Sequence, residues 1–435
     1  MSWAVAFRVR QYLKGSLWVL PLLGGTAGFL LASADDRLER IVDVSSAWQY
    51  SAGTATSVLT AIVGASIALL GFVVTMGVLV VQLATGTLSP RFMRLWYRDR
   101  LQKVVLAAFT ATFTFAFGLL RRIEEGSVPH IGVTAAGAAV GASLLLMLLY
   151  LDRFAHALRP VAVASQVARA GREVVVAAIS PNADRPPAGD GRVAWTGRPL
   201  LTVHADRSGT IQAIHKSGLV AAAERADCLL VLPRGVGDFV PREAPLLHVY
   251  GAGTVPGERA LRAKVALGDE RTIEQDPAFA LRILVDIAIR ALSPAVNDPT
   301  TACQVIDYVQ DLLEDMGRAE VGVPWELRDA AGRVRVVLPS RGWEDYLQLA
   351  VVEIREYGAA SPQVCRRLRA MLVDLLDAVR PERRPAVGAE IAALDALGAR
   401  SFSDPALRAY AAGCDRQGVG GTRFIRAGTD APVEP

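Results

Sequence analysis

Long uncharged apolar segments in the first third of the 435-residue chain constrain its fold more than any other feature. A bilayer core about 30 Å thick needs roughly 20 apolar residues in a helix that rises 1.5 Å per residue. Because a charged side chain at membrane depth is costly, we searched for segments without Asp, Glu, Lys, Arg or His. Such segments predict four transmembrane helices within residues 1–152, at about 15–34, 58–83, 104–120 and 131–151.

Composition supports this division of the chain. Hydrophobic residues make up 52% of the sequence and the mean hydropathy is +0.31, with most of the excess before Asp152. The net charge of +4 is explained by basic residues flanking membrane helices, and no basic stripe interleaved with aromatic residues indicates a nucleic-acid partner. The cysteines lack CxxC spacing, so we expect packed thiols and neither disulfides nor a zinc site; they are Cys228, Cys303, Cys365 and Cys414.

Basic residues set the expected orientation. Arg8, Arg10 and Lys14 precede the first apolar segment, which we interpret as a retained helix and not a signal peptide because three further segments follow. Since short cytoplasmic loops are rich in Lys and Arg, this arm and the basic loop after the second segment should be cytoplasmic, with both termini inside. The beginning of that loop is a candidate cytoplasmic mouth: Ser89, Pro90, Arg91, Arg94, Arg98 and Arg100.

Small residues recur four positions apart inside the apolar segments. The pairs are Gly24 with Gly28, Gly64 with Ala68, Gly71 with Thr75, and Gly137 with Gly141. Such spacing lets helix backbones approach closely in lipid. It indicates packing within one four-helix bundle or, alternatively, an oligomer interface or pore-lining face. The lack of charge at membrane depth argues against a proton-coupled transporter, whereas a channel lined by Ser, Thr or backbone carbonyls is still allowed.

The remaining two thirds of the chain should form an α+β cytosolic domain. Residues 200–205 and 210–215 alternate like strands around a polar turn, which predicts a β-hairpin. We expect, in chain order, a helical connector and linker, a small β-rich, barrel-like module, a helical C-terminal part and a disordered tail: 153–197, 198–257, 258–415 and 416–435.

The β-rich module contains a weak carrier-like signature. Its residues 237–240 and 245–247 resemble the strand-turn-strand signature of biotinyl and lipoyl carrier domains. A carrier needs a lysine at a hairpin tip, and Lys216 does not stand in such a setting. We therefore expect a structural barrel, without a modified lysine or any other cofactor.

Two features of the helical part are candidate functional sites. Arg282, Asp286 and Arg290 form a row of alternating charge at helical spacing, which is either a solvated salt-bridge ladder or an interface. The following elbow should break the helix, with an Asn that either adopts a left-handed backbone or makes a side-chain hydrogen bond, and an Asp-Pro pair that starts the next helix. The elbow residues singled out are Ser293, Pro294, Asn297, Asp298, Pro299 and Thr300.

The elbow also carries a family resemblance. Residues 290–302 (RALSPAVNDPTTA) resemble the hallmark of a bacterial family of predicted membrane proteins, domain of unknown function 2254. Further matching pieces are 88–91 (LSPR) with Asp99-Arg100, 353–358 (EIREYG) and 361–364 (SPQV). The resemblance spans nearly the whole chain and implies the same four-span topology in a bacterial inner membrane. It brings no activity with it.

Motifs of catalysis are not found in the sequence. The histidines show no HxH or HExxH spacing, and no P-loop, dinucleotide fingerprint or nucleophile elbow occurs. His204 and His215 would meet across the predicted hairpin, where a polar pair is favoured over a metal site. The sequence therefore favours a homo-oligomeric channel gated or assembled by its cytosolic domain. The alternatives are a membrane-anchored sensor or scaffold that binds a ligand or partner protein and, less favoured, a membrane enzyme.

Overall fold

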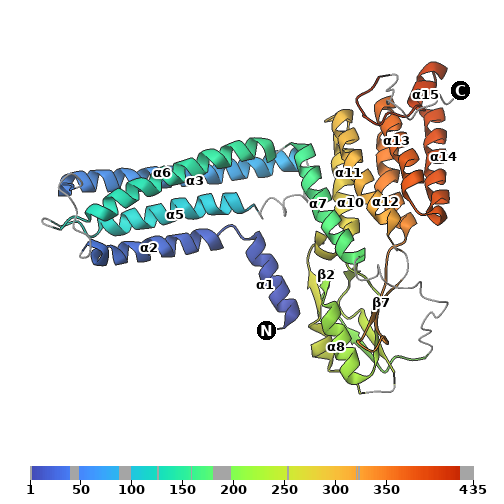
Figure 1. Cartoon of the computed structure of the whole chain (residues 1–435), viewed down its shortest axis with the longest axis horizontal. Coiled ribbons are helices and arrows are strands. Elements are labelled where there is room, and N and C mark those ends of the chain that lie inside the picture. The colour runs from blue at the N-terminus through green and yellow to red at the C-terminus, as the bar shows by residue number, and fades with distance from the viewer. Residues whose placement is uncertain are drawn as a thin grey trace. The chain divides into compact units, whose positions relative to one another are not determined.

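The chain folds into two compact units. The structure is a computed structural model that describes residues 2–39, 49–87, 99–124, 127–157, 159–179, 197–251, 254–319, 321 and 324–421. One unit, Val9–Val163, is a helical bundle, and the other joins Met1–Arg8 to Ala164–Pro435 in a mixed α/β unit. Figure 1 labels elements of both units.

The helical bundle contains the apolar segments. Its helices are α2 (Val19–Glu39), α3 (Ala52–Thr87), α5 (Arg100–Leu120) and α6 (His130–Ala157), preceded by α1 (Trp3–Gly15). Three helices are long and apolar enough to cross a membrane, and a fourth span results if α1 and α2, which meet at an angle of 73°, count as one. The first predicted segment therefore begins at the last residue of α1 and runs across the break into α2, whereas the other three lie within single helices.

Glycines bring α2 and α5 into close contact. A Cβ atom at Gly24 would overlap the carbonyl oxygen of Ala107, and one at Gly28 would overlap that of Ala111. Thr114 on α5 donates a hydrogen bond of 2.9 Å to the carbonyl oxygen of Gly25. The first small-residue pair therefore serves packing within the bundle, as close approach between helices in lipid requires.

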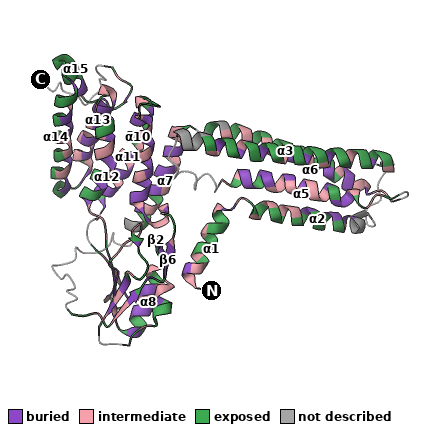
Figure 2. Ribbon diagram, turned by 180° about the vertical axis from the view of Figure 1, so that it is seen from behind, coloured by how far each residue is buried: buried purple, intermediate pink, exposed green. Residues whose placement is uncertain are grey.

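The other small-residue pairs face open space. Apart from the adjoining residues and backbone of the same helix, no atom of the described residues lies within 4 Å of a Cβ built at Gly64, Gly71, Gly137 or Gly141. Helices α3 and α6 bury a narrow face and expose much of the rest, as their largely green ribbons in Figure 2 show. Packing inside a single bundle does not account for these pairs.

Two sheets form the β-rich part of the α/β unit. The first is mixed and five-stranded, with the order β1-β5-β3-β8-β7, and the second is antiparallel and three-stranded, with the order β4-β2-β6. The strands are β1 (Leu201–His204), β2 (Gly209–Ile214), β3 (Leu229–Val231), β4 (Phe239–Val240), β5 (Pro245–Tyr250), β6 (Val265–Gly268), β7 (Trp325–Arg328) and β8 (Val334–Leu338). Helices α8 (Lys216–Ala226) and α9 (Glu258–Arg262) accompany them.

The sheet topology corrects two predictions. Strands β1 and β2 do not form a hairpin, because β1 pairs with β5 while β2 pairs with β4 and β6. Among the described residues the strands form two open sheets and no closed barrel, so the barrel-like module was wrong. Strands β6, β7 and β8 come from beyond residue 257, and the shared core includes Ile211, Leu230 and Val336.

Helices dominate the rest of the α/β unit, where α10 to α14 lie side by side (Figure 1). Several begin with a capping side chain followed by proline, an arrangement in which the missing N–H of proline is harmless. Asp276, Asp298, Ser361 and Asp404 cap in this way. The helices are α7 (Pro160–Ile179), α10 (Pro277–Ala291), α11 (Pro299–Arg318), α12 (Trp343–Tyr357), α13 (Pro362–Ala378), α14 (Arg384–Ser401) and α15 (Pro405–Ala411), with 3-10 turns η4 (Ile273–Gln275) and η5 (Pro381–Arg383).

Candidate functional site

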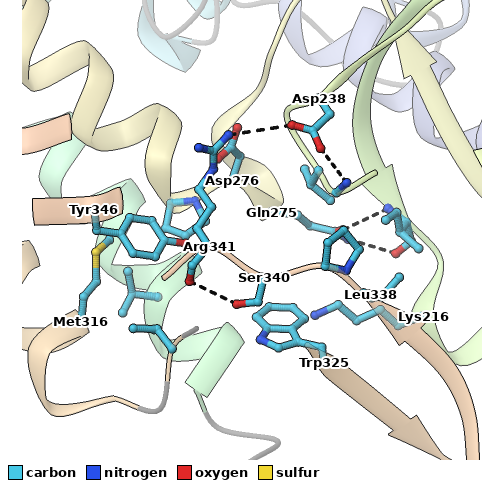
Figure 3. A pocket seen from close by; sticks show the side chains of 17 residues that line it. Lys216, Asp238, Gln275, Asp276, Met316, Trp325, Leu338, Ser340, Arg341 and Tyr346 are labelled. Atoms are coloured by element: carbon cyan, nitrogen blue, oxygen red, sulfur yellow. Dashed lines mark hydrogen bonds and ion pairs between the residues drawn. The ribbon is translucent and has the colours of Figure 1, made fainter. Parts of the chain in front are cut away.

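A cavity of about 280 Å³ lies inside the α/β unit. It is placed where β2 and β8 end and β7 begins, close to the beginning of α8, α10 and α12. Figure 3 shows its labelled side chains, with Lys216 and Trp325 together on one side and Tyr346 beside Met316 on another. The lining residues are Val175, Ile214, Lys216, Gly235, Val236, Asp238, Gln275, Asp276, Pro277, Met316, Val321, Trp325, Leu338, Pro339, Ser340, Arg341 and Tyr346.

Backbone pairing positions the side of the cavity that carries Lys216, Trp325 and Leu338, which we call the lysine wall. Trp325 at the beginning of β7 pairs with Leu338 at the end of β8, so both reach the same end of the mixed sheet. Gln275 accepts a hydrogen bond of 3.0 Å from the backbone N–H of Ile214 and donates one of 3.3 Å to its carbonyl oxygen. This two-way bond ties η4 to the last residue of β2, two positions before Lys216.

Lys216 places a cation beside an aromatic ring. Its Nζ lies 3.7 Å from the ring centroid of Trp325, a cation–π contact. Burial lowers the pKa of Lys216 to about 8 because desolvation disfavours the charged form. Within the described part of the chain, no carboxylate or carbonyl oxygen accepts a hydrogen bond from this ammonium group.

The acidic residues at the cavity have partners of their own. Asp276 is only 3% exposed; it accepts hydrogen bonds of 3.2 Å from the side chain of Arg271 and from the N–H of Phe279. Burial raises the pKa of Asp276, and Arg271 and Arg341 oppose that rise. Asp238 accepts a hydrogen bond of 2.8 Å from the N–H of Gly235 and lies 3.9 Å from Arg341.

Tyr346 closes the cavity on the side of α12. Burial, and then the nearby charge of Asp276, raises the pKa of Tyr346 to about 12, so its hydroxyl stays protonated at neutral pH. The polar lining at this side is therefore a hydroxyl and an Arg–Asp network, while Met316, Val175 and Val321 supply apolar surface.

The predicted elbow folds as expected but lies elsewhere. Asn297 adopts a left-handed backbone with φ of 47°, and the side chain of Asp298 accepts a hydrogen bond from the N–H of Thr301 at 3.0 Å. Pro299 is the first residue of α11, and Gln363 donates to the hydroxyl of Thr300 at 3.4 Å. The elbow residues, with Ser293 and Pro294, do not line the cavity.

The predicted charge row forms one ion pair along α10 and a second ion pair between helices. Arg282 donates to Asp286 on α10 at 2.7 Å, and also to both carboxylate oxygens of Glu353 on α12 at 2.6 and 2.7 Å. Arg290 is in the last turn of α10. The row therefore fastens α10 to α12, and it too lies away from the cavity.

Most of the candidate cytoplasmic mouth lies outside the described residues. This holds for Ser89, Pro90, Arg91, Arg94 and Arg98. Arg100 is the first residue of α5, directly after its N-cap Asp99, which lies 3.7 Å from Arg153.

His204 and His215, which were expected to meet across the predicted hairpin, have different partners. The carbonyl oxygen of His204 accepts a hydrogen bond from Arg262 at 2.9 Å, whereas the ring of His215 stacks on Trp3 at 4.8 Å. Burial, and then the nearby charge of Lys264, lowers the pKa of His215. The described residues contain no group of three or more His, Cys, Asp or Glu side chains placed to hold a metal ion.

Sequence reasoning missed the cavity because its residues come from segments far apart in the chain. One signal was present: Lys216 is one of only four lysines in a chain that otherwise uses arginine. A lysine differs from arginine in shifting its pKa readily on burial. Asp276 offered a second signal, but an Asp-Pro pair is equally typical of a plain helix start.

Several apolar helices beside a mixed α/β unit define a class, that of predicted membrane proteins with a second, folded unit. A family model described as predicted membrane protein (DUF2254) matches residues 14–374, and the chain belongs to this family. The resemblance carried by the elbow motif is thereby confirmed.

Relatives of the chain occur in mycobacteria. An uncharacterized protein of Mycobacterium bovis and one of Mycobacterium tuberculosis are each 32% identical to it over 448 residues. Each match covers 98% of this chain and 84% of the relative. No solved structure shows a significant match.

Proposed function

We propose that this protein is a membrane-anchored receptor whose α/β unit binds a small molecule in the cavity beside Lys216. One observation carries the proposal: a cavity of about 280 Å³ holds an ammonium group that no acceptor in the described chain satisfies. This volume lies just below the roughly 300–1,000 Å³ typical of ligand pockets, which fits a small ligand. The proposal is a binding function and includes no catalytic step.

The N-terminal arm supports a topology with both termini on one side of the membrane. Met1–Arg8 belongs to the same compact unit as Ala164–Pro435, and the N–H of Ala4 donates to the carbonyl oxygen of Ala263 at 3.0 Å. An even number of crossings is then required, so the bent pair α1 and α2 counts as one of four spans. With basic flanks inside, the α/β unit is cytosolic at a bacterial inner membrane.

A screen of the full chain in lipid nanodiscs tests the receptor proposal. The wild type and the cavity-filling variant Val236→Trp are each challenged with a broad library of small metabolites, and thermal stabilisation is recorded. We expect at least one compound to stabilise the wild type and not the variant, since ligand binding to the native state raises its stability. A library that yields no such compound would contradict the proposal.

A second candidate is a homo-oligomeric channel. The observation that favours it is the open space around Gly64, Gly71, Gly137 and Gly141, since small residues on a helix face allow close helix pairing in lipid. In this case several copies would pair through α3 and α6, and the α/β unit would assemble or gate them. Purified protein should then form a multimeric particle that conducts ions or solutes in liposomes, and a monomer without flux counts against it.

A further inference from the structure

The charges around the cavity do not balance at Lys216. The carboxylates of Asp238 and Asp276 each accept a backbone hydrogen bond and each lie close to an arginine. The ammonium group of Lys216 meets only the face of Trp325, among the described residues. Lys216 is half-buried, and a partly desolvated cation without a counter-ion is unfavourable. The wall therefore has room for one negative group from outside the chain.

The helix that begins at this wall favours the same sign of charge. Lys216 is the first residue of α8, which is eleven residues long and has no side-chain hydrogen bond at its N-cap, His215. Helix N-termini stabilise anions through free N–H groups and the helix dipole. This adds to the unbalanced ammonium and would not suffice without it.

The remaining lining restricts the rest of the ligand. Ile214, Val236, Trp325 and Leu338 surround the lysine wall with apolar surface, and Met316 with Val321 continues it. Apolar surface of this kind excludes ligands that are charged throughout, because their outer groups would lose hydration without compensation.

We propose that the cavity binds a small organic anion, a carboxylate or a phosphoryl group on an apolar body, whose charged end meets the Nζ of Lys216. The proposal rests on the receptor function above and names its ligand class. The anion takes the place that no side chain of the described chain fills, and the apolar body lies against Trp325 and Leu338.

Binding of this kind is linked to protonation. A bound anion stabilises the charged ammonium, so the pKa of Lys216, about 8 in the free protein, rises on binding. The affinity is then constant below about pH 8 and falls about tenfold per pH unit above it, with uptake of a proton.

Other charged groups also surround the cavity. Asp238, Asp276 and Arg341 line it, and burial raises the pKa of Asp276 while Arg271 and Arg341 oppose that rise. The pKa of Tyr346 is raised to about 12, and that of His215, which stacks on Trp3, is lowered.

Matched probes test the ligand class. Benzoate and phenylphosphonate carry the anion on an apolar ring, whereas benzamide and benzylamine have a neutral and a cationic group instead. Calorimetric titration of the full chain in nanodiscs, between pH 6.5 and 9.5, should show binding of at least one anion and at least tenfold weaker binding of the other two. An absence of anion binding, or an equal affinity for benzamide or benzylamine, would overturn the proposal.

Variants assign the binding to Lys216. Lys216→Met should weaken anion binding at least tenfold and abolish the pH dependence, and Lys216→Arg should restore binding without the loss above pH 8. Lys264→Met, at a lysine that does not line the cavity, should bind as the wild type does. Anion binding that survives in Lys216→Met overturns the inference. If the metabolite screen finds only neutral or cationic ligands that Val236→Trp blocks, the ligand class is wrong while the receptor function stands.

Discussion

Arg282 shows how one side chain fastens two helices. Its guanidinium group is 19% exposed and forms a two-oxygen contact with Glu353 on the neighbouring helix, in addition to its contact with Asp286. Charge-assisted bonds of this fork-like geometry are among the stronger ones in proteins. Glu353 belongs to one of the segments that carry the family resemblance, so that segment has a structural role here.

Loss of this ion pair should lower stability. Glu353→Gln removes one charge from a site that is 46% exposed, and we expect a decrease of about 1–2 kcal/mol in the free energy of unfolding. Thermal unfolding of the full chain in detergent, followed by intrinsic fluorescence, measures it. Glu356→Gln is the control, because the side chain of Glu356 is 53% exposed and, among the described residues, its ion pair is with the adjacent Arg355, so its loss should be nearly neutral.

Asn297 offers a second prediction, on backbone strain. Its φ of 47° lies in the left-handed region. Most residues with a Cβ atom lose roughly 1–2 kcal/mol of conformational energy there, whereas Gly, Asn and Asp adopt it readily. Asn297→Ala should therefore destabilise the protein by about 1 kcal/mol, and Asn297→Gly should be close to neutral. Chemical denaturation of the three proteins decides it. Equal stability of Ala and Gly variants would show that the left-handed backbone is not the constraint.

Helices and strands differed in how far the sequence predicted them. The helix start at Asp298-Pro299 was readable, because capping is local and needs only adjacent residues. Strand β6 was missed because four apolar residues carry no period that separates strand from helix. The β1–β2 hairpin was wrong for the same reason at longer range: pairing with β5 and β6 depends on segments that local pattern does not connect.

The cavity was not predicted because local sequence pattern does not show which distant segments come together. Lys216 acquires its lowered pKa through burial, and β7, which places Trp325 against it, is absent from the sequence-based interpretation. Alternating hydrophobicity predicts one buried face and not which distant side chains share it. The elbow, in contrast, was predicted in detail, yet its capping and left-handed residue shape a turn away from the cavity.

The contact between α2 and α5 gives a prediction for a pair of helices. Gly28→Leu would force a side chain into the carbonyl oxygen of Ala111, and overpacking of this kind costs typically 1–3 kcal/mol. We expect a lower melting temperature in detergent and a smaller monodisperse fraction. Gly137→Leu is the matched control, since open space surrounds that glycine. Equal melting temperatures of the two variants would contradict the close helix contact.

The first residues of the chain pack within the α/β unit. Trp3 stacks on His215, and His215 directly precedes Lys216, so the arm that leads into the first apolar segment contacts the residue beside the cavity wall. A ligand that shifts the start of α8 would therefore act on Trp3. For the proposed receptor, the Trp3–His215 contact is a physical route from the ligand to the N-terminal arm. This route requires that the arm and the α/β unit lie on the same side of the lipid.

Cysteine labelling tests that requirement. In a background without the native cysteines, single cysteines are placed at Ser2, Ser127 and Arg400, and intact cells are treated with a maleimide that does not cross membranes. Because Met1–Arg8 and Ala164–Pro435 form one unit, Ser2→Cys and Arg400→Cys should react only after permeabilisation, whereas Ser127→Cys, between α5 and α6, should react from outside. Labelling of positions 2 and 400 from opposite faces would require an odd number of crossings, and would separate Trp3 from His215 by the full bilayer.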